Sequence, residues 1–205
     1  MARESRKDSI LKAALFCFTE HGVEATTIDM IREASGASIG SLYHHFGNRE
    51  RIIGALYLEG IRRYGLVLNG AFTTDSTTEQ RVRSVVLGYL GWVAENPDWA
   101  RFLFNSRGQV EAGPLGDELK SINALHVSRM KAVWEEMQTH GDLRTIPAPC
   151  IPALITGPAQ EIAKAWLAGR LKGALLDYAE PLAEAAWRSV RADDISSGDE
   201  GRFRA

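Results

Sequence analysis

Residues 26–46 read TTIDMIREASGASIGSLYHHF. Apolar residues recur at helical spacing on both sides of the glycine-containing turn at 34–38, which predicts two short helices. Thr26 has Asp29 three residues further on, the spacing of a capping box, so we expect Thr26 to begin the first helix. Ser38 is a preferred N-cap residue for the second helix. A turn this short suits two crossed helices, so the stretch predicts a helix-turn-helix.

The second helix of this pair carries an unusual outer face. Leu42 and Phe46 are four residues apart and share one side, which we expect to be buried. In a helix-turn-helix the second helix enters the major groove of DNA. There an apolar side chain can contact a thymine methyl, and a small residue allows close approach. The outer face suits this role, because it consists of Ile39, Gly40, Tyr43 and His44.

Net charge does not explain DNA binding in this segment. Residues 1–52 hold seven basic and seven acidic side chains. Three helix starts, at Thr26 and Thr27, at Ser38 and at Asn48, lie close in sequence, and helix N-termini bind phosphate through their backbone N–H groups. Hydroxyl and imidazole groups for phosphates or bases come from Ser41, Tyr43, His44 and His45.

Helical spacing continues along the rest of the chain, which predicts an all-α fold of about nine helices. We expect residues 1–52 to form a three-helix DNA-binding domain, residues 53–195 a larger ligand-binding and dimerisation domain, and residues 196–205 a disordered tail. The other expected helices cover residues 6–21, 48–71 with Asn48 as the cap, 77–95, 97–107, 117–140, 151–170 and 174–193.

Positions 10–53, which begin ILKAALFCFTEHGVEATTIDM and end with SLYHHFGNRERII, closely resemble the N-terminal domain of TetR-type transcriptional regulators. The resemblance implies a dimer on a palindromic operator and an inducer pocket in the larger domain. It also implies phosphate contact by Thr27, Ser38, Tyr43, His45 and Arg49, with base contact near Ile39, Gly40 and His44. The departures are Arg32 for a small residue, Ala37 for valine, Ile39 for a polar residue and Arg49 for lysine.

The larger domain is rich in aromatic and methionine residues, which suit an organic ligand held between facing helices. Each of them alone fits plain core packing as well. The ligand-binding residues that we expect are Tyr89, Trp92, Phe102, Arg107, Asn123, His126, Met130, Trp134 and Trp166.

The last two expected helices carry two apolar stripes, which together expose more apolar surface than one protomer should tolerate, so we expect these helices to form the homodimer interface. The alternative is that both stripes pack within their own domain. One stripe comprises Ala159, Ala163, Leu167, Leu171, Leu175 and Tyr178, and the other Ala183, Ala186, Trp187 and Val190.

No metal-ligand spacing, phosphate loop or catalytic constellation is found, so we expect no metal, no cofactor and no enzyme activity. The absence of a leader segment and of a membrane-length apolar run predicts a cytoplasmic protein that does not enter the membrane. The favoured function is a repressor released from double-stranded DNA by a small hydrophobic effector. A helical small-molecule-binding protein or enzyme, and a dimeric regulator without a ligand, are the alternatives.

Overall fold

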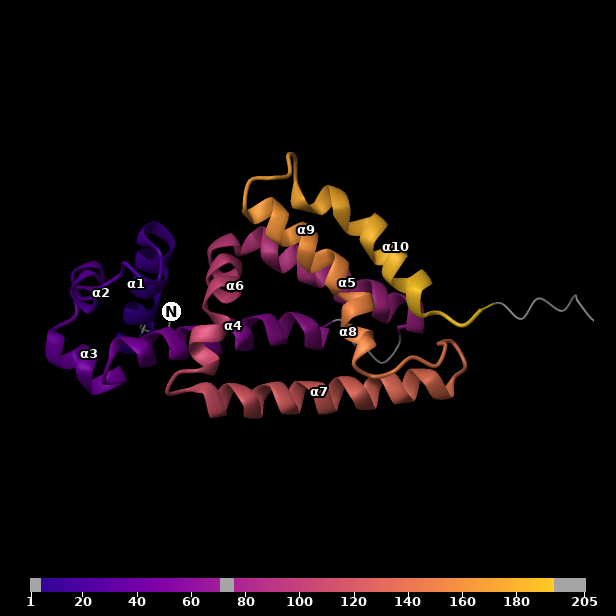
Figure 1. Cartoon of the computed structure of the whole chain (residues 1–205), viewed down its shortest axis with the longest axis horizontal. Helices are drawn as coiled ribbons and strands as arrows, with labels where there is room; N and C mark the ends of the chain where they lie inside the picture. The colour runs from indigo at the N-terminus through magenta and orange to yellow at the C-terminus, as the bar shows by residue number, and fades with distance from the viewer. Residues whose placement is uncertain (1–4, 71–75, 194–205) are drawn as a thin grey trace, which may run out of the picture.

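The computed structural model describes residues 5–70 and 76–193, which form ten α-helices and no strand (Figure 1). The all-α prediction is confirmed. None of the helices in these two ranges is long and apolar enough to cross a membrane. The helices are α1 (Arg6–His21), α2 (Ile28–Ser35), α3 (Ile39–Phe46), α4 (Arg49–Gly70), α5 (Thr78–Glu95), α6 (Pro97–Glu111), α7 (Gly116–Thr139), α8 (Cys150–Ile155), α9 (Gly157–Leu167) and α10 (Ala179–Val190), with a 3-10 turn at Leu175–Tyr178.

The helices α1, α2 and α3 gather at one end of the molecule, and α4 runs from them into the larger helical body (Figure 1). The expected domain border between residues 52 and 53 therefore lies inside α4. In the larger body α5 packs against α10, while α7 follows one long edge (Figure 1). The expected tail at 196–205 lies outside the described residues.

Helix boundaries differ from the predictions at three places. α6 continues through Gly108 to Glu111, beyond the end at residue 107 that the sequence predicts. The single helix expected over 151–170 is two helices, because the chain restarts at Gly157 with Pro158 in the first turn of α9. The helix expected from residue 174 begins only at Ala179, which places Pro181 in the first turn of α10.

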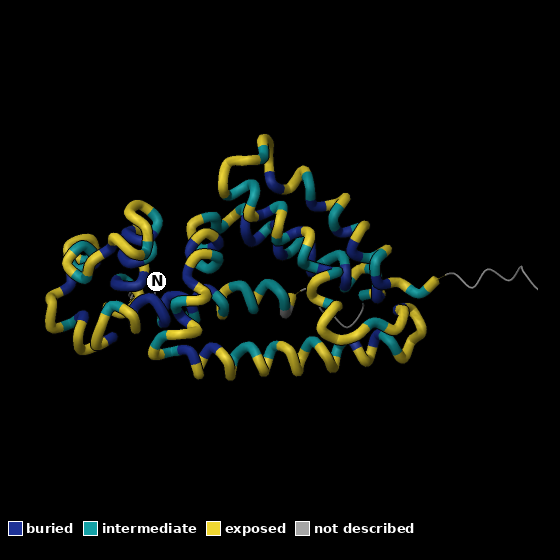
Figure 2. Tube along the Cα trace, viewed as in Figure 1, coloured by how far each residue is buried: buried dark blue, intermediate teal, exposed yellow. Residues whose placement is uncertain are grey.

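The buried apolar residues form two clusters rather than one core. The first cluster is centred on α1–α4, and it also contains Phe102, Val110 and Leu119 from α6 and α7. The ring of Phe102 stacks on Phe18 of α1 with centroids 5.5 Å apart. The larger body therefore contributes side chains to the core beneath the helix-turn-helix. In Figure 2 buried residues are found both in the helix-turn-helix end and in the adjoining part of the larger body.

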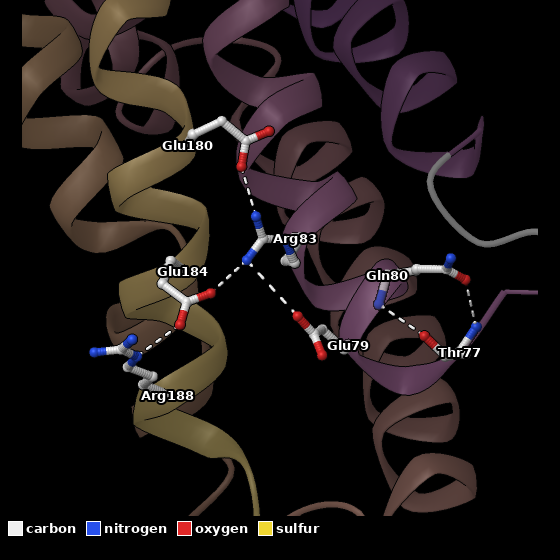
Figure 3. A network of polar contacts seen from close by, with 7 residues as sticks. All are labelled: Thr77, Glu79, Gln80, Arg83, Glu180, Glu184 and Arg188. Atoms are coloured by element: carbon white, nitrogen blue, oxygen red, sulfur yellow. Dashed lines mark hydrogen bonds and ion pairs between the residues drawn. The ribbon is translucent and has the colours of Figure 1, made fainter.

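In the larger body a network of ion pairs joins α5 to α10 (Figure 3). Arg83 on α5 lies 2.5 Å from Glu180 and 2.5 Å from Glu184, both on α10. Glu184 also accepts from Arg188 at 2.6 Å. Arg188 and then Arg83 lower the pKa of the Glu184 carboxyl, because both favour its charged form. The network fixes how α10 lies along α5.

A glycine lets α4 approach α6 closely. A Cβ atom placed on Gly60 would lie 2.9 Å from Cδ2 of Leu103 and 3.0 Å from Cε3 of the Trp99 ring. The guanidinium of Arg63 covers the same Trp99 ring at 5.0 Å from its centroid. The indole therefore has little freedom to move away from α4.

A Gly60→Ala substitution is expected to lower the free energy of unfolding by about 1–2 kcal/mol, because overpacking costs about 1–3 kcal/mol and the gain in helix propensity returns part of it. Gly65→Ala is the matched control in the same helix. Its Cβ would meet His126 at an ordinary 3.6 Å, so it should be neutral or slightly stabilising. Urea denaturation measures both, and equal stabilities of the two variants would contradict this packing.

Candidate nucleic-acid interface

The segment 28–46 forms a helix-turn-helix. α2 ends at Gly36, whose φ of 60° places it in the left-handed region that favours glycine. The hydroxyl of Ser38 then accepts from the backbone N–H of Ser41 at 3.1 Å and caps α3, as predicted. Leu42 and Phe46 are buried in the cluster that also holds α1. Packing therefore fixes the inner face of α3 and leaves its outer face free.

The outer face of α3 is exposed. Ile39 and Tyr43 retain 46% and 53% of their accessible surface, values unusual for such apolar side chains. A Cβ atom on Gly40 would meet nothing within 4 Å. His44 and His45 are exposed beside them, with their rings 5.3 Å apart. The expectation that Ile39 and Tyr43 point outward is confirmed, and α3 presents a face with a small residue at its centre.

Thr27 caps α2, so the prediction of Thr26 as the cap is wrong. The Thr27 hydroxyl accepts from Met30 N at 3.2 Å, and Met30 Sδ accepts from Thr27 N at 3.4 Å. Thr26 is 1% exposed, with its hydroxyl 2.8 Å from the carbonyl oxygen of Gly22 and 3.0 Å from that of Cys17. The expected direct contact of Thr26 with DNA does not fit this burial, since the hydroxyl is engaged inside the protein.

Arg49 is turned toward the loop between α1 and α2. Its Nε donates to the carbonyl oxygen of Thr26 at 2.7 Å, and its Nη2 donates to that of Val23. Its Nη1 lies 3.8 Å from Glu50. The side chain is 19% exposed, so most of it is buried against the loop. Sequence reasoning missed this arrangement, in which Arg49 ties the start of α4 to the loop before the helix-turn-helix.

The residues expected to bind a ligand fall into separate groups. Tyr89, Trp92 and Trp134 are buried in the second cluster, which lies mainly on α5, α9 and α10. There the ring of Tyr64 packs on that of Tyr89 at 5.8 Å and on that of Trp92 at 5.5 Å between centroids. The Tyr89 hydroxyl and Trp134 Nε1 are buried, and neither has a hydrogen-bond partner among the described residues. Burial raises the pKa of Tyr89, so its hydroxyl stays a donor. Tyr64 belongs to this aromatic group but is not among the expected ligand-binding residues, because nothing in the sequence of α4 distinguishes it from an ordinary core tyrosine.

The other expected ligand residues lie elsewhere. Phe102 packs in the first cluster, and exposed Arg107 pairs with Glu111 at 2.8 Å. Trp166 Nε1 donates to the carbonyl oxygen of Gly173 at 3.1 Å. Asn123, His126 and Met130 are half-buried on α7. The nine expected residues therefore do not line one pocket, because α6 and α7 supply side chains to both clusters.

Most of the apolar stripes expected at a dimer interface are buried within their own chain. The alternative of packing inside the protomer holds for Ala159, Ala163, Leu175, Ala183, Ala186 and Val190. These residues are small or lie on the faces of α9 and α10 that meet α5, so they fill the core. Half-buried apolar side chains remain on the two helices, namely Ile162, Trp166, Leu167, Leu182 and Trp187.

A short helix pair with an exposed recognition-type face, attached through α4 to a larger helical body, defines the class of helix-turn-helix proteins. Residues 10–56 match the family model described as bacterial regulatory proteins, tetR family. Over this segment, which runs from α1 into the first part of α4, the chain is similar to that family.

The curated relatives are repressors that match part of the chain. The HTH-type transcriptional repressor AcnR of Corynebacterium efficiens is 42% identical over 111 residues, which cover 53% of this chain and 52% of that protein. KstR2 of Mycolicibacterium smegmatis, another HTH-type transcriptional repressor, is 41% identical over 49 residues, or 24% of each chain. The chain thus spans about half the length of AcnR and a quarter of KstR2.

Solved structures match the whole fold at low sequence identity. A TetR family regulator from Marinobacter aquaeolei has a TM-score of 0.76 at 18% identity and covers 92% of this chain and 96% of that one. KstR2 of Mycobacterium tuberculosis, described as a ketosteroid transcriptional regulator, has a TM-score of 0.73 at 15% identity and covers 93% and 97%. At these identities the likeness establishes the fold, from α1 to α10.

Proposed function

We propose that this protein is a dimeric, sequence-specific DNA-binding repressor whose α3 helix reads the major groove of a palindromic operator. The observation that carries the proposal is the outer face of α3, where Ile39 and Tyr43 are exposed around Gly40 on a helix held from below by Leu42 and Phe46. The segment matched by the tetR family model contains this face, and two HTH-type repressors are similar to part of the chain.

The contacts divide between bases and phosphates. Ile39 and Gly40 face outward at the start of α3, the part of a recognition helix that reaches base edges, and His44 is exposed in its last turn. Phosphate contacts fall to the capped helix starts and to hydroxyl and imidazole groups, namely Thr27, Ser38, Ser41, Tyr43 and His45. Thr26 and Arg49 act indirectly, because they hold the loop that positions the helix pair.

Dimerisation places two such faces on one DNA duplex. Two recognition helices must lie about 34 Å apart, or a multiple of that, to enter successive major grooves. We assign the dimer contact to the half-buried side chains of α9 and α10, with Trp166 and Trp187 as the largest of them. Aromatic side chains of this kind are enriched in protein interfaces.

A small effector would release DNA by favouring a dimer with a different spacing. The buried aromatic group around Tyr89 supplies the site that we propose. The Tyr89 hydroxyl and Trp134 Nε1 have no partner in the part of the chain that the structure describes, so both can donate to a bound molecule. Tyr64 on α4 contacts this group, and the same helix begins beneath α3. An effector there acts on α4 directly.

Tyr43→Ala is expected to weaken binding to a duplex selected from random DNA by about tenfold or more, since one good contact contributes about 1–3 kcal/mol. Fluorescence anisotropy measures the affinity, and sedimentation checks that the dimer is unchanged. Phe16→Ala is the control, because Phe16 is an aromatic side chain on α1 that is 59% exposed. Affinity retained in Tyr43→Ala would refute the assignment of α3.

A further inference from the structure

A groove runs along the side of α4 between α1, the end of α3 and α7. Its volume of about 650 Å³ lies within the range of about 300–1,000 Å³ that is usual for small-molecule sites. Leu11 of α1, His45 of α3, Ala55 of α4 and Leu115, just before α7, mark the end beneath the helix-turn-helix. The groove thus reaches from the larger body to the base of the recognition helix.

The groove has apolar walls that the protein leaves uncovered. Leu66 on α4 and Leu125 on α7 both line it, and they are 61% and 51% exposed. Leu58 and Ile122 add half-buried surface between them. Apolar side chains that gather on one concave surface mark a binding site more often than isolated ones do. An aliphatic occupant would remove these walls from water.

Cations without partners border the same groove. Lys7, Arg51 and Arg129 line it and make no ion pair within the described residues 5–70 and 76–193. Of the acids in the lining, Glu59 is bound by Arg62 at 2.7 Å and Arg63 at 2.8 Å, which lowers the pKa of its carboxyl.

Two other acids complete the lining. Asp8 accepts from the Ser5 hydroxyl at 2.6 Å, and Glu118 lies in the first turn of α7, where the helix dipole favours a negative charge. Neither Asp8 nor Glu118 forms an ion pair within the described residues, so three unpaired cations face two unpaired acids at the groove. This excess favours an anionic group on the occupant.

The groove is separate from the aromatic group around Tyr89. Glu59, Arg62 and Leu66 are spaced three and four residues apart on α4 and line the groove. Tyr64 points to another side of the same helix, where it contacts Tyr89 and Trp92. A molecule in the groove would not occupy the effector site proposed above.

We propose that this groove binds a long-chain aliphatic carboxylate, with the chain along Leu66 and Leu125 and the carboxylate held by Lys7 and Arg129. Binding here does not depend on the proposed DNA-binding function, so the two can fail separately. An occupant would contact α1, α3, α4 and α7 together, which gives it a direct route to the recognition helix.

Isothermal titration calorimetry of the full chain with sodium decanoate tests the proposal, with decan-1-ol as the uncharged probe. We expect saturable binding of one decanoate per chain and at least tenfold weaker binding of the alcohol. In the Lys7→Gln/Arg129→Gln variant, decanoate should bind at least tenfold more weakly, because charge-assisted contacts are lost. Leu125→Gln should also weaken binding, and its exposed position keeps the fold intact.

Two variants serve as controls. Lys131→Gln removes a cation from α7 outside the groove lining, and Tyr89→Phe removes the unpartnered hydroxyl of the aromatic group. Both should bind decanoate like the wild-type protein. The proposal is overturned by the absence of saturable binding, by equal binding of the alcohol, by unchanged affinity in the double variant, or by a loss confined to Tyr89→Phe.

Discussion

A Gly40→Leu variant is expected to fold like the wild-type protein and to bind operator DNA about a hundredfold more weakly, through the loss of about two base contacts of 1–3 kcal/mol each. A Cβ atom at this position would meet nothing within 4 Å in the protein. The added side chain therefore costs the free protein little, and it gains the helix propensity that glycine lacks. On DNA the same side chain would stand between α3 and the floor of the groove.

The matched control for this experiment is Gly108→Leu on α6, where a Cβ atom also meets nothing within 4 Å. Thermal unfolding should give similar stabilities for the two variants and the wild-type protein. Anisotropy should show a loss of DNA binding only for Gly40→Leu. If Gly40→Leu binds as tightly as Gly108→Leu, α3 does not lie in the major groove.

An Arg49→Gln variant is expected to lose about 3 kcal/mol of unfolding free energy and most of its affinity for DNA. Hydrogen bonds from a charged donor contribute about 1.5–3 kcal/mol each, and Arg49 donates to the carbonyl oxygens of Thr26 and Val23. Without them the loop before α2 is released and its partly buried carbonyl oxygens lose their partner. The helix pair would then lose its fixed orientation.

Arg49→Lys separates this role from a simple phosphate contact. A lysine keeps the charge but cannot donate in the fork geometry of a guanidinium, so we expect it to restore only part of the stability. Arg51→Gln is the control, because Arg51 is an exposed arginine two residues further along α4. Urea denaturation and anisotropy measure the two effects. Full stability in Arg49→Gln together with weakened DNA binding would indicate a phosphate contact alone.

The helix-turn-helix was predictable from sequence because its signals are local. The caps at Ser38 and Asn48, the glycine at the end of α2 and the four-residue spacing of Leu42 and Phe46 each act within one turn of helix. The exposure of Tyr43 follows from the same spacing. These features needed no knowledge of the rest of the chain.

Features that depend on contacts between distant residues were missed. Thr26 and Thr27 are equally good caps by type, and only the buried carbonyl oxygens of Cys17 and Gly22 decide which one turns inward. The partners of Arg49 lie 23 and 26 residues away, beyond any local pattern.

The larger body was harder to predict for the same reason. Phe102 and Trp134 look alike as aromatic residues at helical spacing, yet they lie in different clusters. Small residues such as Ala163 and Ala183 suit both a dimer interface and close packing against α5. Sequence periodicity shows that a face is apolar, but the partner of that face is set by the tertiary fold.

The most direct test of the central claim is selection of duplexes from a random DNA pool by the purified full-length chain. We expect enrichment of a palindrome whose half-sites are separated by about one helical turn of DNA or a multiple of it, with binding that weakens steeply as salt is raised. Enrichment should disappear with Gly40→Leu. A pool that stays random after repeated rounds, or that is enriched equally by Gly40→Leu, would contradict the account.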